Sequence, residues 1–103
     1  MENKIKFTKK AKQDLEESVK FYKDRKFGLG QDFLNTRKER VFQIQADPEN
    51  NPSDNGGIKK AKIRVFPFYI YYIFKNSLVI IIAFWHRARL PFPREERLKY
   101  IKE

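Results

Sequence analysis

The sequence predicts an α+β fold with the element order β-α-α-β-β-β-α, in which a helical hairpin packs on a small, mainly antiparallel sheet. Two observations lead to this fold. Apolar side chains recur at helical spacing in residues 9–46, and three short apolar runs separated by breakers fill residues 58–85. Two helices that precede a meander of strands are typical of a layered domain, because the helices must cover the apolar face of the sheet. With 103 residues, the chain is expected to form a single domain over 1–103.

The first half is predicted to hold a short strand at 5–7 and two helices. Thr8 is the expected N-cap of a helix that runs to about Lys26, with an apolar stripe made of Ala11, Leu15, Val19 and Tyr22. The pair of glycines in Gly28-Leu29-Gly30 separates the helices. The second helix ends before Asp47-Pro48, because a residue before proline avoids helical geometry. Its expected buried stripe is Phe33, Leu34, Val41 and Ile44, with Arg37, Lys38, Glu39 and Arg40 outside.

The second half is predicted to hold three strands and a short helix. Residues 58–66 alternate, with Ala61, Ile63 and Val65 on one face and Lys60, Lys62 and Arg64 on the other. Residues 68–75 are aromatic and β-branched, and Asn76-Ser77 is a two-residue turn. Residues 78–85 are apolar on both faces and should lie in the middle of the sheet. After Pro91 and Pro93, a short helix is expected to dock through Leu98 and Ile101.

Positive charge is concentrated in the second half of the chain. The net charge is +10, with 12 basic and 10 acidic side chains in residues 1–54 but 11 basic and 3 acidic in residues 55–103. No carboxylate occurs between Asp54 and Glu95. This imbalance indicates an anionic partner, which could be RNA, DNA or an acidic protein. The alternative is a solubilising surface, although the lack of interspersed acids weighs against it.

The amino-acid composition also argues against several kinds of functional site. The chain has no cysteine and one histidine, so a disulfide framework, a thiolate nucleophile and a metal site are not expected, and no cofactor is expected. Without an apolar signal segment or an apolar run of about 20 residues, the protein is expected to be soluble, cytoplasmic and free of membrane contact.

Two basic groups are the candidate functional residues. Lys60, Lys62 and Arg64 share one strand face, and His86, Arg87 and Arg89 leave the end of another strand. Cationic side chains beside a histidine could serve a metal-free ribonuclease, in which cations stabilise a phosphorane and the histidine moves a proton. The alternatives are a histidine satisfied at a strand end, and a basic face that is either solvated or binds an acidic partner. The abundant aromatic residues fit a core, a partner-binding groove or base stacking.

Several motifs, taken in order, resemble one known family. They are Ala11-x-x-Asp14-Leu15, Gly28-Leu29-Gly30-x-x-Phe33, Arg64-x-Phe66-Pro67-x-x-Ile70-x-Tyr72 and His86-x-x-Arg89-x-Pro91. Together they are similar to the RelE/ParE superfamily of toxins from type II toxin–antitoxin modules, over nearly the whole chain. The resemblance implies a growth-inhibiting toxin, associated with plasmid stabilisation, that a cognate antitoxin neutralises in a hetero-oligomer.

The superfamily implies two mechanisms. ParE-like members poison DNA gyrase by binding. The motif His86-x-x-Arg89-x-Pro91, which ends the last predicted strand, resembles this branch more closely than the RelE-like branch. RelE-like members cut mRNA on the ribosome; in that case Arg64, His86 and Arg89 would be the catalytic residues. For either target, the residues expected to bind it, or nucleic acid, are Lys60, Lys62, Arg64, Arg87 and Arg89. A third possibility is an inactive basic binding module.

Overall fold

The structure is a computed structural model that describes residues 3–54 and 56–101. Its elements follow the predicted order: β1 (Lys4–Phe7), α1 (Lys9–Arg25), α2 (Leu29–Ala46), β2 (Lys59–Lys62), β3 (Phe68–Lys75), β4 (Leu78–His86) and α3 (Arg94–Leu98). The predicted α+β fold is therefore confirmed. No helix in the described ranges is long and apolar enough to cross a membrane.

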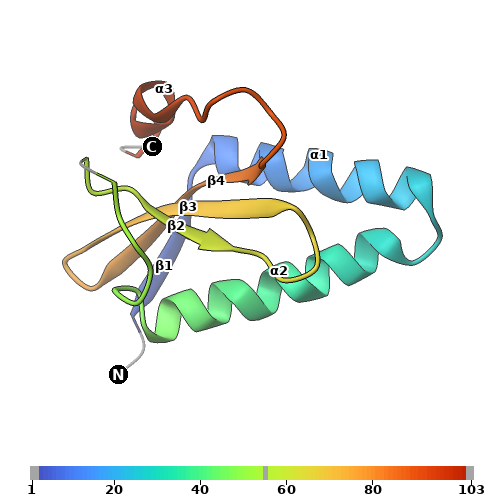
Figure 1. Ribbon diagram of the computed structural model, residues 1–103. Helices are drawn as coiled ribbons and strands as arrows, with labels where there is room; N and C mark the ends of the chain where they lie inside the picture. Colours follow the sequence, from blue (N-terminus) through green and yellow to red (C-terminus); the bar gives the residue numbers. More distant parts are fainter. Residues whose placement is uncertain (1–2, 55, 102–103) are drawn as a thin grey trace.

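The sheet has the strand order β1-β4-β3-β2, with β1 parallel to β4 and the other neighbours antiparallel (Figure 1). The predicted meander is thus confirmed, and β4 lies between β1 and β3. Its residues 79–85 are all buried, as their apolar character on both faces predicts. Asn76 and Ser77 both have positive φ, at 53° and 61°, which is the geometry of a tight two-residue hairpin turn.

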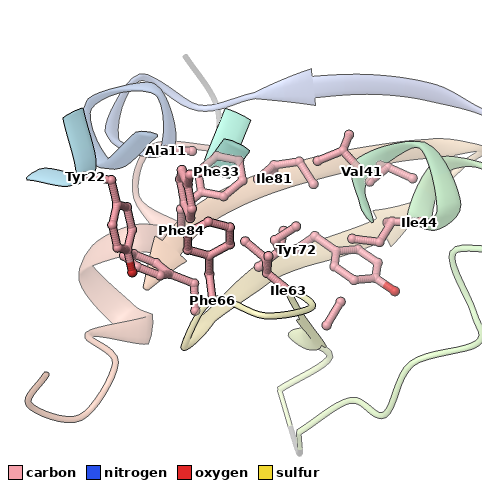
Figure 2. Close-up of a cluster of buried hydrophobic side chains, with 14 residues drawn as sticks. Ala11, Tyr22, Phe33, Val41, Ile44, Ile63, Phe66, Tyr72, Ile81 and Phe84 are labelled. Carbon is pink, nitrogen blue, oxygen red and sulfur yellow. The ribbon is translucent and has the colours of Figure 1, made fainter. Parts of the chain in front are cut away.

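The helices lie on both sides of the sheet. The α1–α2 hairpin covers one face and extends past the end of the sheet, whereas α3 lies over the other face (Figure 1). The larger core cluster fills the space beneath the hairpin (Figure 2), and its most deeply buried large side chains include Phe33, Ile44, Ile63, Ile70, Tyr72 and Phe84. A smaller cluster on the α3 side consists of Ile58, Ile80 and Ile82, covered in part by Phe92, Leu98 and Ile101.

The first helix forms as its sequence predicts. Thr8 is the N-cap, and its hydroxyl oxygen accepts a hydrogen bond from the Ala11 N–H at 3.2 Å. Ala11 and Tyr22 are buried, and Leu15 and Val19 pack against the same core. The predicted apolar stripe is therefore confirmed.

The buried face of α2 differs from the prediction in one respect. Gly30, Phe33, Val41 and Ile44 are buried, but Leu34 is only partly so. Arg37 is half-buried, with its guanidinium carbon 6.0 Å from the Phe84 ring centroid, and burial lowers the pKa of Arg37. The expectation that Arg37 lies outside is wrong, because it stands four residues from both Phe33 and Val41 and so continues their stripe.

The first strand of the meander is shorter than its alternating pattern predicts. The strand ends at Lys62, and Val65 is 82% exposed with φ of 75°, so the expectation that Val65 joins the buried face is wrong. The chain turns at this point and Phe66 points inward instead. Its ring packs against those of Tyr22 and Phe33, with centroids 4.9 and 5.1 Å away. Aromatic packing under the hairpin tip therefore prevails over strand alternation.

A buried ion pair joins α1, β4 and α3. Arg97 donates two hydrogen bonds to the Asp14 carboxylate, at 2.6 and 2.8 Å, and a third to the Ile82 carbonyl. The Phe84 N–H donates to the same carboxylate. Since β1 ends at Phe7, opposite Ile81, these two backbone groups of β4 lie beyond the last strand pairing. The ion pair supplies hydrogen-bond partners to these two backbone groups, which a neighbouring strand would otherwise have to provide.

We predict that Asp14→Ala lowers the free energy of unfolding by about 3–5 kcal/mol, because it leaves a buried guanidinium without its carboxylate and a buried N–H without an acceptor. Urea denaturation followed by circular dichroism measures this change. Asp24→Ala removes an exposed carboxylate from the same helix and should change stability by less than about 0.5 kcal/mol. Equal stabilities of the two variants would contradict the role assigned to Asp14.

Candidate functional site

The register of the sheet brings two basic loops to the same end. Phe68 pairs with His86, and the Ile63 N–H donates to the Phe68 carbonyl at 3.0 Å, so these three residues are aligned across the sheet. Arg64 and Arg87 each follow this line by one residue. Ile63 and His86 are thus two strand spacings apart, roughly 10 Å. The Arg87 N–H also donates to the Pro67 carbonyl at 2.9 Å and so fastens the two loops together.

Lys60 and Lys62 lie within β2, before Arg64 in the chain, on the face of the sheet that α3 partly covers. They pair with Tyr71 and Tyr69 across the β2–β3 ladder, and both lysines are exposed. The Lys60 ammonium lies 4.5 Å from the Tyr69 ring centroid. Their side chains therefore extend the basic surface from the end of the sheet onto this face.

His86 and Arg89 are held by contacts with aromatic rings. The His86 imidazole lies edge-on to Phe68, with centroids 5.1 Å apart, and its Nδ1 accepts a hydrogen bond from the Ala88 N–H at 3.0 Å. The Arg89 guanidinium carbon lies 3.8 Å from the centroid of the Trp85 ring. Stacking of this kind fixes the plane of a guanidinium while its edge remains free to bind an anion.

The segment after β4 folds back across the sheet on the α3 side. Phe92 stacks on Tyr71 with ring centroids 3.9 Å apart and meets Trp85 edge-on, and the Trp85 indole N–H donates to the Leu90 carbonyl at 3.1 Å. Arg94 then pairs with Asp54 at 3.1 Å. These contacts limit the motion of Arg89, because Trp85 before it and Leu90 and Phe92 after it are held in place.

Asp54 also organises the loop that precedes β2. Burial acts to raise the pKa of Asp54, but the N–H groups of Ile58 and Gly56 and the guanidinium of Arg94 outweigh it, so the pKa lies below its usual value. The ionised carboxylate accepts from the Gly56 and Ile58 N–H groups at 2.8 and 2.9 Å. The loop is thereby joined to the start of α3.

The end of β2 is fixed by Arg40, which the sequence places on the outside of its helix. Arg40 donates to the Lys62 carbonyl at 2.8 Å and to the Asn51 side-chain oxygen at 2.9 Å. Asn51 in turn donates to the Tyr72 hydroxyl, which donates to the Pro48 carbonyl. Arg40 therefore sets the direction in which the chain leaves β2, and with it the position of Arg64. Its helical spacing gave no sign of this role.

The arrangement is suited to binding rather than to a compact catalytic centre. Arg64 lies beside α2, in a groove that it shares with Arg40 and Val65, whereas His86 lies two strands away. In residues 3–54 and 56–101, no three His, Cys, Asp or Glu side chains gather as a metal site would require.

Comparison with known proteins identifies the class to which this fold and basic surface belong. The family model for the ParE toxin of the type II toxin–antitoxin system parDE matches residues 5–91. Because the match covers most of the chain, the chain belongs to the ParE toxin family. The resemblance noted in the sequence motifs is therefore confirmed, including the preference for the ParE-like branch.

A solved structure has a similar fold. It is the chromosomal ParDE TA system from P. aeruginosa, with a TM-score of 0.70 and 20% sequence identity over 82% of this chain and 95% of that chain. At this identity the similarity concerns the fold alone. No curated protein sequence gives a significant match.

We predict that Val65→Gly raises the stability of the protein by about 0.5–1 kcal/mol. A left-handed conformation costs an L-residue roughly 1–2 kcal/mol, and part of the gain is offset by the greater freedom of glycine in the unfolded chain. Thermal denaturation should give a higher Tm for Val65→Gly, whereas Val65→Ala keeps the Cβ atom and should gain less. A Tm for Val65→Gly at or below that of the wild type would show that the φ of 75° is not strained.

Proposed function

We propose that this protein is the growth-inhibiting toxin of a type II module, that it binds and poisons DNA gyrase, and that a cognate antitoxin neutralises it. The observation that carries this proposal is the match of the ParE toxin family model over residues 5–91. Arg64, Arg87 and Arg89, with Lys60 and Lys62 beside them, are the residues to which we assign target binding.

The geometry of the basic surface supports a binding mechanism. Lys60, Lys62, Arg64, Arg87 and Arg89 are all exposed, and positive charge of this kind speeds the approach of an anionic partner. Arginine is also among the residues that contribute most to protein interfaces. Because His86 Nδ1 accepts the Ala88 N–H, the neutral imidazole carries its hydrogen on Nε2 and has no free nitrogen lone pair with which to act as a base.

The gyrase proposal is tested with purified protein, gyrase, supercoiled plasmid and ATP, followed by detergent and protease to reveal trapped breaks. We expect linear DNA to accumulate as the concentration of the protein rises. A translation extract programmed with a defined mRNA is the parallel assay. Codon-positioned mRNA cuts without linear DNA would replace the proposal with a RelE-like nuclease using Arg64, His86 and Arg89. Failure of both assays, with no growth defect, would leave a basic binding module.

We predict that Arg89→Ala weakens gyrase poisoning roughly tenfold, because it removes a stacked, exposed guanidinium from the proposed surface. The concentration that gives half-maximal linear DNA measures the effect. Lys75→Ala is the control, since it removes one positive charge at the opposite end of the sheet, beside the β3–β4 turn. If the two variants poison gyrase equally, Arg89 has no specific part in target binding.

Neutralisation requires a separate measurement. The product of the reading frame beside the toxin gene, purified and titrated calorimetrically, should bind the wild type and Arg89→Ala with similar affinity. Its addition to the gyrase assay should abolish linear DNA formation. A product that binds the toxin without suppressing this activity would contradict the proposed neutralisation.

A further inference from the structure

A cleft opens between α1 and the end of β4, next to the basic surface. It is lined by Glu17, Ser18, Phe21, Phe68, His86 and Arg89. Phe68 is buried, whereas Phe21 is 45% exposed. An apolar side chain that entered this cleft would meet the Phe21 ring, with Phe68 and His86 as its other aromatic neighbours.

Exposed apolar side chains are unevenly distributed over the described part of the molecule. The large ones are Phe21, Phe27, Phe42, Val65 and Leu90. All but Phe42 belong to the hairpin tip, the β2–β3 loop or the segment after β4, which lie at the end of the sheet past which the hairpin extends (Figure 1). Of these five side chains, Phe21 is the one that lines the cleft, with its ring partly open to solvent.

One guanidinium group lines the cleft and a second contacts the Phe21 ring, and both are held by aromatic rings. Arg25 stacks on Phe21, with its guanidinium carbon 4.2 Å from the ring centroid, and Arg89 stacks on Trp85. In the described ranges neither arginine forms an ion pair with a carboxylate. A protein segment that carries an apolar side chain and an adjacent carboxylate fits this arrangement of ring and cation.

Positive charge alone does not give a protein interface high affinity. Exposed charges accelerate and orient association, but they contribute little affinity because solvent screens them. The affinity of protein interfaces resides mainly in a few desolvated aromatic and arginine side chains. The cleft supplies such groups, and it shares Arg89 with the surface to which we assign target binding.

We propose that this cleft is the apolar part of the target-binding surface, and that it receives an apolar side chain from an acidic segment of the target protein. Arg25 and Arg89 pair with the carboxylates of that segment. The inference rests on the proposed function, because it takes gyrase as the target. It assigns to Phe21 an apolar contact with the target, and to Arg25 an ion pair with it, beyond the contacts of the basic residues of the sheet.

Phe21→Ala and Phe42→Ala form a matched pair for the test. Both remove an exposed phenyl ring from a helix, but Phe42 is 61% exposed on α2 and lies away from the cleft. We expect Phe21→Ala to weaken binding to immobilised gyrase holoenzyme at least tenfold in biolayer interferometry, and Phe42→Ala to change it less than twofold. Arg25→Glu should also weaken binding, whereas Lys38→Glu on α2 should have a smaller effect. Unchanged thermal denaturation verifies that the variants fold.

The outcomes separate the inference from the function on which it rests. If the wild type binds gyrase and both phenylalanine variants bind equally well, the cleft inference is overturned and the proposed function stands. If Phe21→Ala weakens binding of the antitoxin but not of gyrase, the cleft belongs to the antitoxin and the inference is likewise overturned. If the wild type does not bind gyrase, the proposed function fails and the inference fails with it.

Discussion

The buried pair of Asp14 and Arg97 is the interaction on which the arrangement of the other elements depends. Both residues are 5% exposed, although they come from helices on opposite sides of the sheet. The pair meets at the edge of β4, where β1 has ended and the backbone groups of Ile82 and Phe84 need partners. A four-residue strand can therefore pair with a nine-residue one, because side chains complete the hydrogen bonding of the longer strand.

The position of the basic surface follows from this anchorage. With α3 held at β4, the intervening segment must cross the sheet, and Phe92 fixes it by stacking on Tyr71. Arg89 leaves β4 under this constraint and stacks on Trp85. On the other side, Arg40 fixes the end of β2 and directs Arg64 toward the same end of the sheet. A surface held in this way loses little conformational entropy when a partner binds, which favours affinity.

Local patterns predicted the fold because each depends on neighbours in sequence. The Thr8 cap, the stripe from Ala11 to Tyr22 and the Asn76-Ser77 turn all formed as expected. The ion pair of Asp14 and Arg97 was not foreseen, since 83 positions separate the two residues and no local rule pairs them. The error at Val65 has a similar origin, because alternation favoured a longer strand and the aromatic cluster around Phe66 ended it. The basic residues could be identified as candidates from the sequence. The cleft beside Phe21 could not, because it forms only where α1 approaches the end of β4 in the fold.

Hydrogen exchange of the protein, alone and bound to gyrase, tests most directly whether one end of the sheet forms the target-binding surface. If this end of the sheet binds gyrase, exchange should slow on binding in three segments: the second half of α1, residues 63–67 and residues 86–90. Exchange in β1 and in the middle of α2 should remain as in the free protein. Slower exchange confined to β1 or to α2, with the three segments unchanged, would show that gyrase binds elsewhere on the protein.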